Sequence, residues 1–216
     1  MKKPSAEAAD LVQQEKTNCV KDKKMKFILA SKSPRRKELL GNLGLKFEIM
    51  ESSADESVIS KDIPPEIYVQ ELAMIKSTSV AACAEKNSLV IGADTVVVAD
   101  GKIIGKPKNF DEAFSMLSSF SNSSHKVYSG ISVTDSSSGR TVADWCETEV
   151  FFNEMTPCEI ENYINTYKPY DKAGAYGIQE YASVFIEKIN GDFFNVVGLP
   201  LSKLYGLLKK EFDVVL

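Results

Sequence analysis

The chain has 216 residues, of which 44% are hydrophobic and 26% are charged, as is usual for a globular protein with enough length for a sizeable core. Its formal net charge of −4 argues against general adhesion to nucleic acid or membrane, so an anion-binding site has to be a local concentration of positive charge. No apolar run approaches the roughly 20 residues that a bilayer-spanning helix needs. The first 24 residues are polar and lack the apolar core of a signal peptide, so we expect a cytoplasmic protein.

The cysteine and histidine content also fits the expectation of a cytoplasmic protein. The four cysteines are far apart in the chain, and no pair has the spacing of a metal site or a redox motif. His125 is the only histidine, and we expect it to be a hydrogen-bonding strand residue without a catalytic role. We therefore expect neither a zinc site nor a disulfide framework, which fits a reducing compartment.

The first half of the chain alternates between strand and helix patterns. Residues 1–24 are expected to form a flexible polar leader, and residues 25–216 a domain. An apolar strand at 27–30 precedes Ser33 and Pro34, a strong helix start because Ser is a good N-cap and Pro fits the first helical position. We then expect a strand at 45–50 and a helix at 64–86.

The second half is dominated by hairpins. Two apolar runs within 88–107 flank Asp100-Gly101, the strongest short hairpin signal in the chain, and long strands at 125–135 and 140–153 should pair with each other. Helices are expected at 111–120, at 156–166 after a capping box, and at 200–212, with a further strand at 182–189. Hairpins require antiparallel pairs, so the pattern predicts an α/β fold with a mixed sheet.

Basic residues crowd the start of the first helix. Lys32, Arg35, Arg36 and Lys37 lie where the helix dipole is already positive, which costs about 0.3–1 kcal/mol for each exposed cation. Free backbone N–H groups and two arginines at one helix end form a suitable phosphate site, and a bound polyphosphate would offset that cost. The alternative is a solvated basic turn with its charges directed away from any ligand.

Asp94 is a carboxylate inside an apolar strand, in LVIGADTVVVAD, two residues after a glycine that would allow another group to approach closely. A buried carboxylate needs a cation, a metal or hydrogen-bond donors, so Asp94 is a candidate for chemistry. The alternative is a carboxylate at a strand end or bulge that caps a loop.

Two further segments carry candidate ligand contacts. GKIIGKP is not a P-loop, because three residues separate its glycines and Pro107 follows Lys106. Lys106 either reaches a phosphate or is an exposed lysine at a strand end. In YDKAGAYGIQ, small residues allow a ligand close to the backbone, and Gln179 offers an amide for a base edge, although composition alone indicates a loop.

Six motifs, LASKSPRRKELL, ADTVVV, GKP, SHKVYSG, DKAGAYGIQ and VVGLP, occur in the order seen in the Maf family, and the chain resembles that family over residues 25–213. Maf proteins are nucleoside triphosphate pyrophosphatases related in fold to the inosine triphosphate pyrophosphatases. The resemblance implies an α/β fold with an elongated mixed sheet flanked by helices and two lobes around a substrate cleft.

The resemblance also implies roles for particular residues. Asp94 corresponds to the acidic catalytic residue, and with Glu56 it would bind a divalent cation, Mg²⁺ or Mn²⁺. The reaction would convert a nucleoside triphosphate to the monophosphate and pyrophosphate. The positions implied to contact substrate are Ser31, Ser33, Arg35, Arg36, Lys76, Thr95, Lys106 and Gln179.

Arg35, Thr95 and Gln179 match the branch that resembles dTTP/UTP pyrophosphatases. The chain departs from the family where Glu180 replaces a usual glycine and where YKPY precedes Asp171. Alternative functions are hydrolysis of 7-methyl-GTP, CTP or modified pyrimidine nucleotides, or a nucleotide-binding regulator of cell division without turnover. Beyond the nucleotide no partner is implied, neither nucleic acid nor membrane, and a homodimer stays open.

Overall fold

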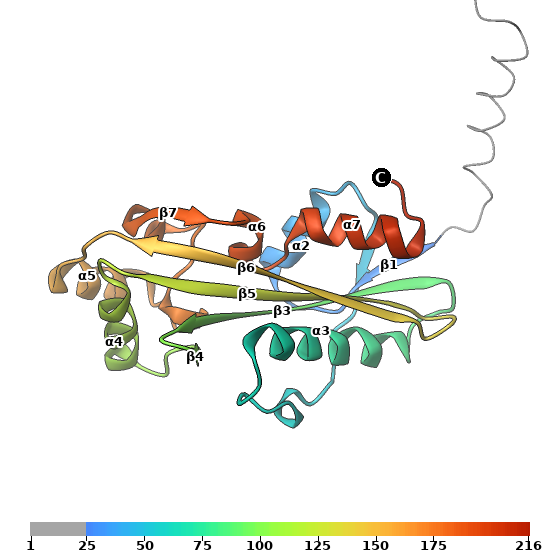
Figure 1. Cartoon of the computed structure of the whole chain (residues 1–216), viewed down its shortest axis with the longest axis horizontal. Helices are drawn as coiled ribbons and strands as arrows, with labels where there is room; N and C mark the ends of the chain where they lie inside the picture. The colour runs from blue at the N-terminus through green and yellow to red at the C-terminus, as the bar shows by residue number, and fades with distance from the viewer. Residues whose placement is uncertain (1–24) are drawn as a thin grey trace, which may run out of the picture.

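A mixed sheet forms the centre of the structure, a computed structural model that describes residues 25–216 (Figure 1). Within that range the sheet has seven strands, in the order β2-β1-β3-β5-β6-β7 with β4 beside β3. They are β1 (Lys26–Leu29), β2 (Phe47–Ile49), β3 (Ser88–Ala99), β4 (Lys102–Ile104), β5 (Ser124–Asp135), β6 (Thr141–Phe152) and β7 (Ile186–Asn190). Strand β1 is parallel to β2 and β3, whereas the other pairs are antiparallel. The predicted mixed sheet is confirmed, and the predicted leader lies outside the described residues.

Helices cover both faces of this sheet (Figure 1). The α-helices are α2 (Pro34–Gly41), α3 (Pro65–Ala81), α4 (Phe110–Phe120), α5 (Pro157–Tyr167), α6 (Phe193–Val197) and α7 (Leu201–Phe212), and the 3₁₀ helices are η1 (Glu56–Val58), η2 (Ala173–Ala175) and η3 (Tyr181–Phe185). Helices α3 and α4 lie on one side of the sheet in Figure 1, and α2, α6 and α7 lie on the other.

Separate apolar cores support the two ends of the elongated sheet. At one end, α4, α5 and η3 enclose buried aromatic and aliphatic residues, including Phe120, Ile160 and Phe185. At the other end, α2 and α7 pack on β1, β3 and β5 through leucines such as Leu40 and Leu204. This division corresponds to the two lobes expected from the sequence.

Two glycines let α3 approach the sheet closely. A Cβ atom at Gly92 on β3 would lie 2.2 Å from a backbone carbonyl oxygen of α3, and one at Gly130 on β5 would lie 2.1 Å from another. Asp94 follows Gly92 by two residues and pairs with Gly130, so its side chain is on the same sheet face as α3. The close approach therefore brings Lys76 of α3 beside Asp94.

The centre of β3 has one uncovered edge. Strand β1 pairs with residues 88–91 of β3, and β4 pairs with residues 97–99 on the same side. Among the described residues, no strand pairs with residues 92–96 along that edge. A ligand can therefore reach Asp94, whose side chain is on the α3 face, and Thr95, whose side chain is on the opposite face.

Local sequence signals produced the expected turns and caps. Ser33 accepts a hydrogen bond from the backbone N–H of Arg36, and Thr156 forms a full capping box with Glu159 at the start of α5. The β3–β4 turn places Asp100 and its glycine at φ of 50° and 72°, as a tight hairpin requires.

Two element predictions need correction, and one helix was missed. The strand expected at 182–189 starts only at Ile186, because 181–185 form η3, whose buried residues Ala182 and Phe185 have the three-residue repeat of a 3₁₀ helix. The helix expected to reach residue 86 ends at Ala81 and turns follow it. Helix α6 was not predicted. Its N-cap, Asp192, accepts from the N–H of Phe194.

Candidate active site

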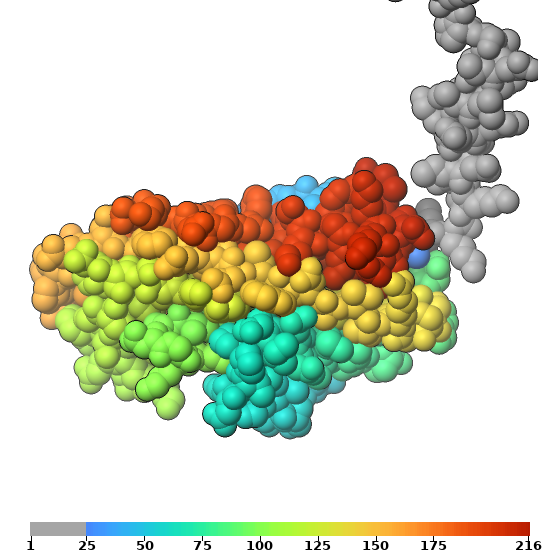
Figure 2. All heavy atoms as spheres, viewed as in Figure 1, coloured from blue at the N-terminus to red at the C-terminus, as the bar shows by residue number. Residues whose placement is uncertain are grey.

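A cavity of about 490 Å³ lies at the uncovered edge of β3, bordered by α3, the β4 hairpin and the segment 171–179. Figure 2 shows a notch in the surface between the β4 region, drawn in green, and the α3 segment, drawn in teal. Every site residue predicted from the sequence except Ser31 lines this cavity: Ser33, Arg35, Arg36, Glu56, Lys76, Asp94, Thr95, Lys106 and Gln179. The structure thus brings together residues from six separate stretches of the chain.

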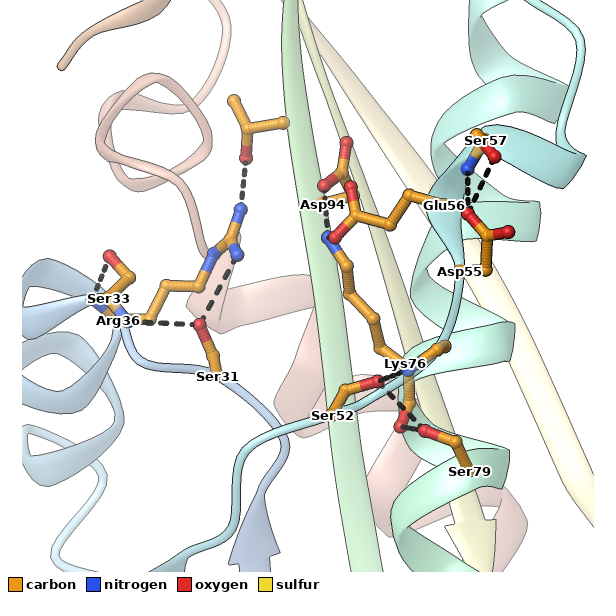
Figure 3. Close-up of polar contacts among 12 residues, drawn as sticks. Ser31, Ser33, Arg36, Ser52, Asp55, Glu56, Ser57, Lys76, Ser79 and Asp94 are labelled. Atoms are coloured by element: carbon orange, nitrogen blue, oxygen red, sulfur yellow. Dashed lines mark hydrogen bonds and ion pairs between the residues drawn. The ribbon is translucent and has the colours of Figure 1, made fainter.

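Two carboxylates converge on one ammonium group in the cavity (Figure 3). The Nζ atom of Lys76 lies 2.6 Å from Oδ1 of Asp94 and 3.0 Å from Oε1 of Glu56. The side chains of Lys76 and Asp94 are only 11% and 13% exposed, so this charge cluster is poorly screened by water. Burial, together with these two carboxylates, raises the pKa of the Tyr68 phenol in the same cavity.

The adjacent acidic residues Asp55 and Glu56 have different functions in the fold. Asp55 is the N-cap of η1, and its Oδ1 accepts from the backbone N–H of Ser57 at 2.9 Å and from the Ser57 hydroxyl at 2.6 Å. Those hydrogen bonds lower the pKa of the Asp55 carboxyl. Only Glu56 lines the cavity, where it joins Lys76.

Arg36 connects three parts of the chain at the opposite side of β3 (Figure 3). Its Nε donates to the carbonyl oxygen of Gly198 at 2.9 Å, Nη2 donates to Oγ1 of Thr95 at 3.2 Å, and Nη1 donates to Oγ of Ser31 at 3.4 Å. Burial lowers the pKa of the guanidinium, which nevertheless stays charged because arginine titrates so high. Ser31 is buried and acts here as a support for Arg36.

The basic start of α2 is divided between the cavity and the outer surface. Arg35 and Arg36 line the cavity, and Nη1 of Arg35 lies 3.8 Å from Oε1 of Glu180. Lys32 forms an ion pair with Glu51, and Lys37 is exposed. The solvated face expected as the alternative therefore applies to the two lysines, whereas the two arginines lie where a bound anion could reach them.

Thr95, Lys106 and Gln179 occupy separate walls of the cavity. The Thr95 hydroxyl lies 2.7 Å from the Ser129 hydroxyl on β5. This contact fixes the position of the hydroxyl that accepts a hydrogen bond from Arg36. Lys106 is exposed at the end of the β4 hairpin, and no ion pair involves it within residues 25–216. Gln179 belongs to the segment that follows α5.

Sequence reasoning missed Lys172, a buried lysine that lines the cavity. The signal was present as the charged pair Asp171-Lys172 beside small residues, but composition indicated only a loop. The hydrogen-bonding strand residue expected at position 125 is confirmed: His125 lies on β5, and its Nε2 lies 2.8 Å from the hydroxyl of Tyr176, which lines the cavity. His125 is 3% exposed, and burial lowers its pKa to about 4.

The described residues do not form a metal centre by themselves. Residues 25–216 contain no cluster of three or more histidine, cysteine, aspartate or glutamate side chains that would hold a metal ion. Asp94 and Glu56 nevertheless converge on a single cation, the Lys76 ammonium. Two carboxylates at one point are the protein ligands that Mg²⁺ uses when a phosphate substrate and water supply the others.

This fold and cavity define a class of protein, an α/β protein whose cleft presents arginines and lysines next to a pair of carboxylates. The chain belongs to the Maf-like protein family, whose model matches residues 26–211. Within the described residues, no helix has the length and apolar character needed to cross a membrane.

Several relatives are similar over nearly the whole family region. A dTTP/UTP pyrophosphatase of Thermoanaerobacter sp. (strain X514) is 50% identical over 88% of this chain and 98% of the relative. The protein of the same name from Alkaliphilus metalliredigens is 52% identical over 88% of this chain and 97% of its own. Among solved structures, the Staphylococcus aureus Ham1 protein aligns with a TM-score of 0.41 and 12% identity, covering 59% of this chain and 71% of that one.

Proposed function

We propose that the protein hydrolyses nucleoside triphosphates, chiefly dTTP and UTP, to the nucleoside monophosphate and pyrophosphate. The observation that carries the proposal is the convergence of Asp94 and Glu56 on Lys76. The cavity that holds them also presents two arginines and Lys106. Relatives about half identical to the chain have the name dTTP/UTP pyrophosphatase and match it over almost their entire length. That combination supports an enzyme in preference to a binding module, which would not need the acidic pair.

In the proposed reaction, water attacks the α-phosphorus of the substrate and Asp94 accepts a proton from that water. The new bond joins the water oxygen to the α-phosphorus, and the bond from the α-phosphorus to the oxygen that bridges it to the β-phosphorus breaks. Pyrophosphate leaves with that oxygen. A carboxylate held in a poorly solvated cluster suits the role of general base, because proton transfer by a positioned group contributes about 10²–10⁴-fold to a rate.

The cations of the cavity would hold the phosphates. Arg35 and Arg36 present planar guanidinium groups suited to bidentate phosphate contacts, and Lys106 adds a charge from the hairpin. Lys76 would orient Asp94 before the reaction and neutralise phosphate charge during it. Arg36 keeps its position through Ser31 and Thr95, so these two residues would act mainly by fixing the guanidinium.

A divalent cation fits the donor set. Glu56 and Asp94 would hold Mg²⁺ or Mn²⁺ together with substrate phosphate oxygens, which are hard ligands for these ions. When bound, such a cation withdraws charge from phosphate oxygens and lowers the pKa of coordinated water. The Lys76 ammonium lies at the point where the two carboxylates converge, so it would have to move or share them.

The base would be selected on the wall formed by the segment after α5. Gln179 carries an adjacent donor and acceptor, which match the donor and acceptor on the edge of uracil or thymine. A base with the wrong pattern leaves buried polar groups unpaired and is disfavoured. A cytoplasmic location remains the expectation made from the sequence, and a homodimer stays open.

Pyrophosphate release across a panel of nucleoside triphosphates, with and without excess EDTA, tests the proposal. We expect kcat/KM to be highest for dTTP and UTP, the products to be monophosphate and pyrophosphate, and EDTA to abolish turnover. Diphosphate plus orthophosphate would overturn the cleavage site. A higher kcat/KM for 7-methyl-GTP or CTP would assign another substrate, and binding without turnover of any triphosphate would favour a nucleotide-sensing regulator.

A further inference from the structure

A buried lysine that the proposed chemistry does not use lies in the wall of the cavity. The side chain of Lys172 is 10% exposed, and its Nζ lies 2.8 Å from Oδ1 of Asp171 and 3.2 Å from Oε2 of Glu180. Both carboxylates are much more exposed, at 69% and 43%. Lys172 and Asp171 line the cavity, whereas Glu180 does not, so Glu180 holds the ammonium from outside the cavity wall.

The backbone of the same segment packs against this ion pair. A Cβ atom at Gly177 would lie 3.1 Å from Cε of Lys172 and 3.1 Å from Cδ of Glu180. The pair is therefore enclosed by the turn that precedes Gln179, which limits the positions open to the lysine. A side chain whose rotamer is fixed by packing and by outer partners can act as a precise hydrogen-bond donor.

The donor count leaves one N–H of Lys172 for a ligand. An ammonium group has three N–H donors, and the structure gives it two acceptors among the described residues, Asp171 and Glu180. A buried donor without a partner is costly, so an acceptor on a bound ligand would contribute directly to affinity.

The charge balance indicates what kind of acceptor that is. The positive charge of Lys172 is offset by its two carboxylate partners, Asp171 and Glu180, so Lys172 offers little net charge to attract a phosphate. The Arg36 guanidinium, in contrast, donates hydrogen bonds only to neutral groups among the described residues. A neutralised donor suits a neutral acceptor such as a carbonyl, and the apolar side chains of Ile178 and Val196 line the same cavity, where a flat ring can pack.

We propose that Lys172 is a specificity-determining residue that donates a hydrogen bond to the 4-oxo group of the pyrimidine base. This inference rests on the proposed function, because it concerns the base of that same substrate. Cytosine carries an amino group at this position, and an ammonium cannot accept a hydrogen bond from it. Lys172 would therefore favour uracil and thymine over cytosine, beside the contact expected from Gln179.

Substrate analogues test the contact in the wild-type enzyme. 4-Thio-UTP replaces the 4-oxo oxygen with sulfur, a weaker acceptor, and 2-thio-UTP makes the same change at the other ring carbonyl. We expect kcat/KM for 4-thio-UTP to be about tenfold lower than for UTP, and 2-thio-UTP to change it less than about twofold. A wild-type enzyme that treats UTP and 4-thio-UTP alike would overturn the proposal whether or not any variant folds.

The variant Lys172→Met assigns the contact to this residue. We expect it to lose about tenfold in kcat/KM for UTP, to show no further loss for 4-thio-UTP, and to discriminate about tenfold less between UTP and CTP. Lys203→Met is the control, because Lys203 pairs with Asp144 at 3.0 Å outside the cavity, and it should leave all ratios unchanged. Equal losses for UTP, 4-thio-UTP and CTP would mean that Lys172 is structural or binds phosphate, and would overturn the inference.

A binding measurement separates this inference from the proposed function. Calorimetric titration with UMP and 4-thio-UMP reports the base contact without any turnover, and Lys172→Met should remove the difference between the two ligands. An enzyme that hydrolyses no triphosphate but shows this pattern would overturn the proposed function and support the base contact. Turnover of UTP together with binding that does not depend on Lys172 would support the proposed function and overturn the base contact.

Discussion

Lys76 on α3 donates a hydrogen bond to Asp94 on β3 across 2.6 Å, and this pair connects the close packing of α3 on the sheet to the proposed chemistry. The two residues meet because α3 lies directly on two glycines of the sheet, one of them Gly92. Asp94 is therefore neither a capping carboxylate nor an unpaired one. It is held by a cation in the central part of β3, residues 92–96, where no strand among the described residues pairs along the edge shared by β1 and β4.

The first prediction concerns the carboxylate itself. Asp94→Asn should lower kcat for pyrophosphate release at least about a hundredfold, because the amide cannot accept the proton of the attacking water. The fold should persist, since the amide oxygen can still accept from Lys76. Steady-state kinetics and a thermal melt measure both effects. Asp100→Asn, at the exposed tip of the β3–β4 hairpin, is the control. Turnover within a few-fold of wild type would make Asp94 structural.

The second prediction concerns the close approach of α3. Gly92→Ala should lower the free energy of unfolding by about 1–3 kcal/mol, because the added Cβ would lie 2.2 Å from the carbonyl oxygen of Ala73. Moving α3 away would also separate Lys76 from Asp94 and reduce kcat. Urea unfolding with kinetics checks both. Gly41→Ala is the matched control, since its Cβ would meet nothing within 4 Å. Wild-type stability in Gly92→Ala would show that α3 is not confined there.

Much of the candidate site could be predicted because its residues carry strong local signals. A carboxylate inside an apolar strand and arginines at a helix start are visible without a structure, and both line the cavity. The Lys76–Asp94 contact follows from the register of β3 against β5 and from the path of α3, which no local pattern specifies. The resemblance to the Maf family pointed to Lys76, because no chemical pattern in its own stretch of the helix marks this lysine.

The missed features depend on how the chain packs in three dimensions, which local composition does not show. Glu180 and the turn at Gly177 enclose Lys172, although its sequence context resembles an ordinary loop. Residues 181–185 have the composition of a strand but form η3, since Ala182 and Phe185 face the core on one side. Both features, the enclosed lysine and the 3₁₀ helix, depend on which side chains are buried, and burial is a property of the whole fold.

The third prediction separates the two arginines of α2. Arg36→Ala should lower the free energy of unfolding by about 1–3 kcal/mol, because Ser31, Thr95 and Gly198 lose a partly buried donor. Arg35→Ala should change the free energy of unfolding by less than about 0.5 kcal/mol, since its contact with Glu180 is 3.8 Å long and exposed. Removing this cation also removes an unfavourable interaction with the positive end of the helix dipole. Both variants should raise KM.

Thermal melts without nucleotide, followed by KM measurements, distinguish these effects. Lys37→Ala serves as the control, because Lys37 lies on the same helix turn but is exposed outside the cavity. Equal destabilisation by Arg35→Ala and Arg36→Ala would contradict the anchoring role assigned to Arg36. Unchanged KM in both variants would remove the arginines from phosphate binding.

The fourth prediction concerns the pH dependence of stability through His125. Burial lowers its pKa in the folded state to about 4, whereas the unfolded chain should titrate near the ordinary value of about 6.5. Above that pH both states are neutral and the residue contributes no pH dependence. As the pH falls toward 4, the unfolded state binds a proton that the folded state does not, so stability falls, by about 3 kcal/mol in total.

Urea unfolding of wild type and His125→Gln at pH 7, 6 and 5 isolates this contribution, since carboxylates titrate in both proteins. We expect wild type to lose more stability than the variant between pH 7 and 5, because only wild type carries the histidine that must stay neutral beside Phe120 and Tyr176. Stability has to fall with decreasing pH in this range, because the unfolded state binds one more proton than the folded state. Equal pH dependence in both proteins would show that His125 protonates in the folded state, through an opening of the aromatic core that supports the cavity wall.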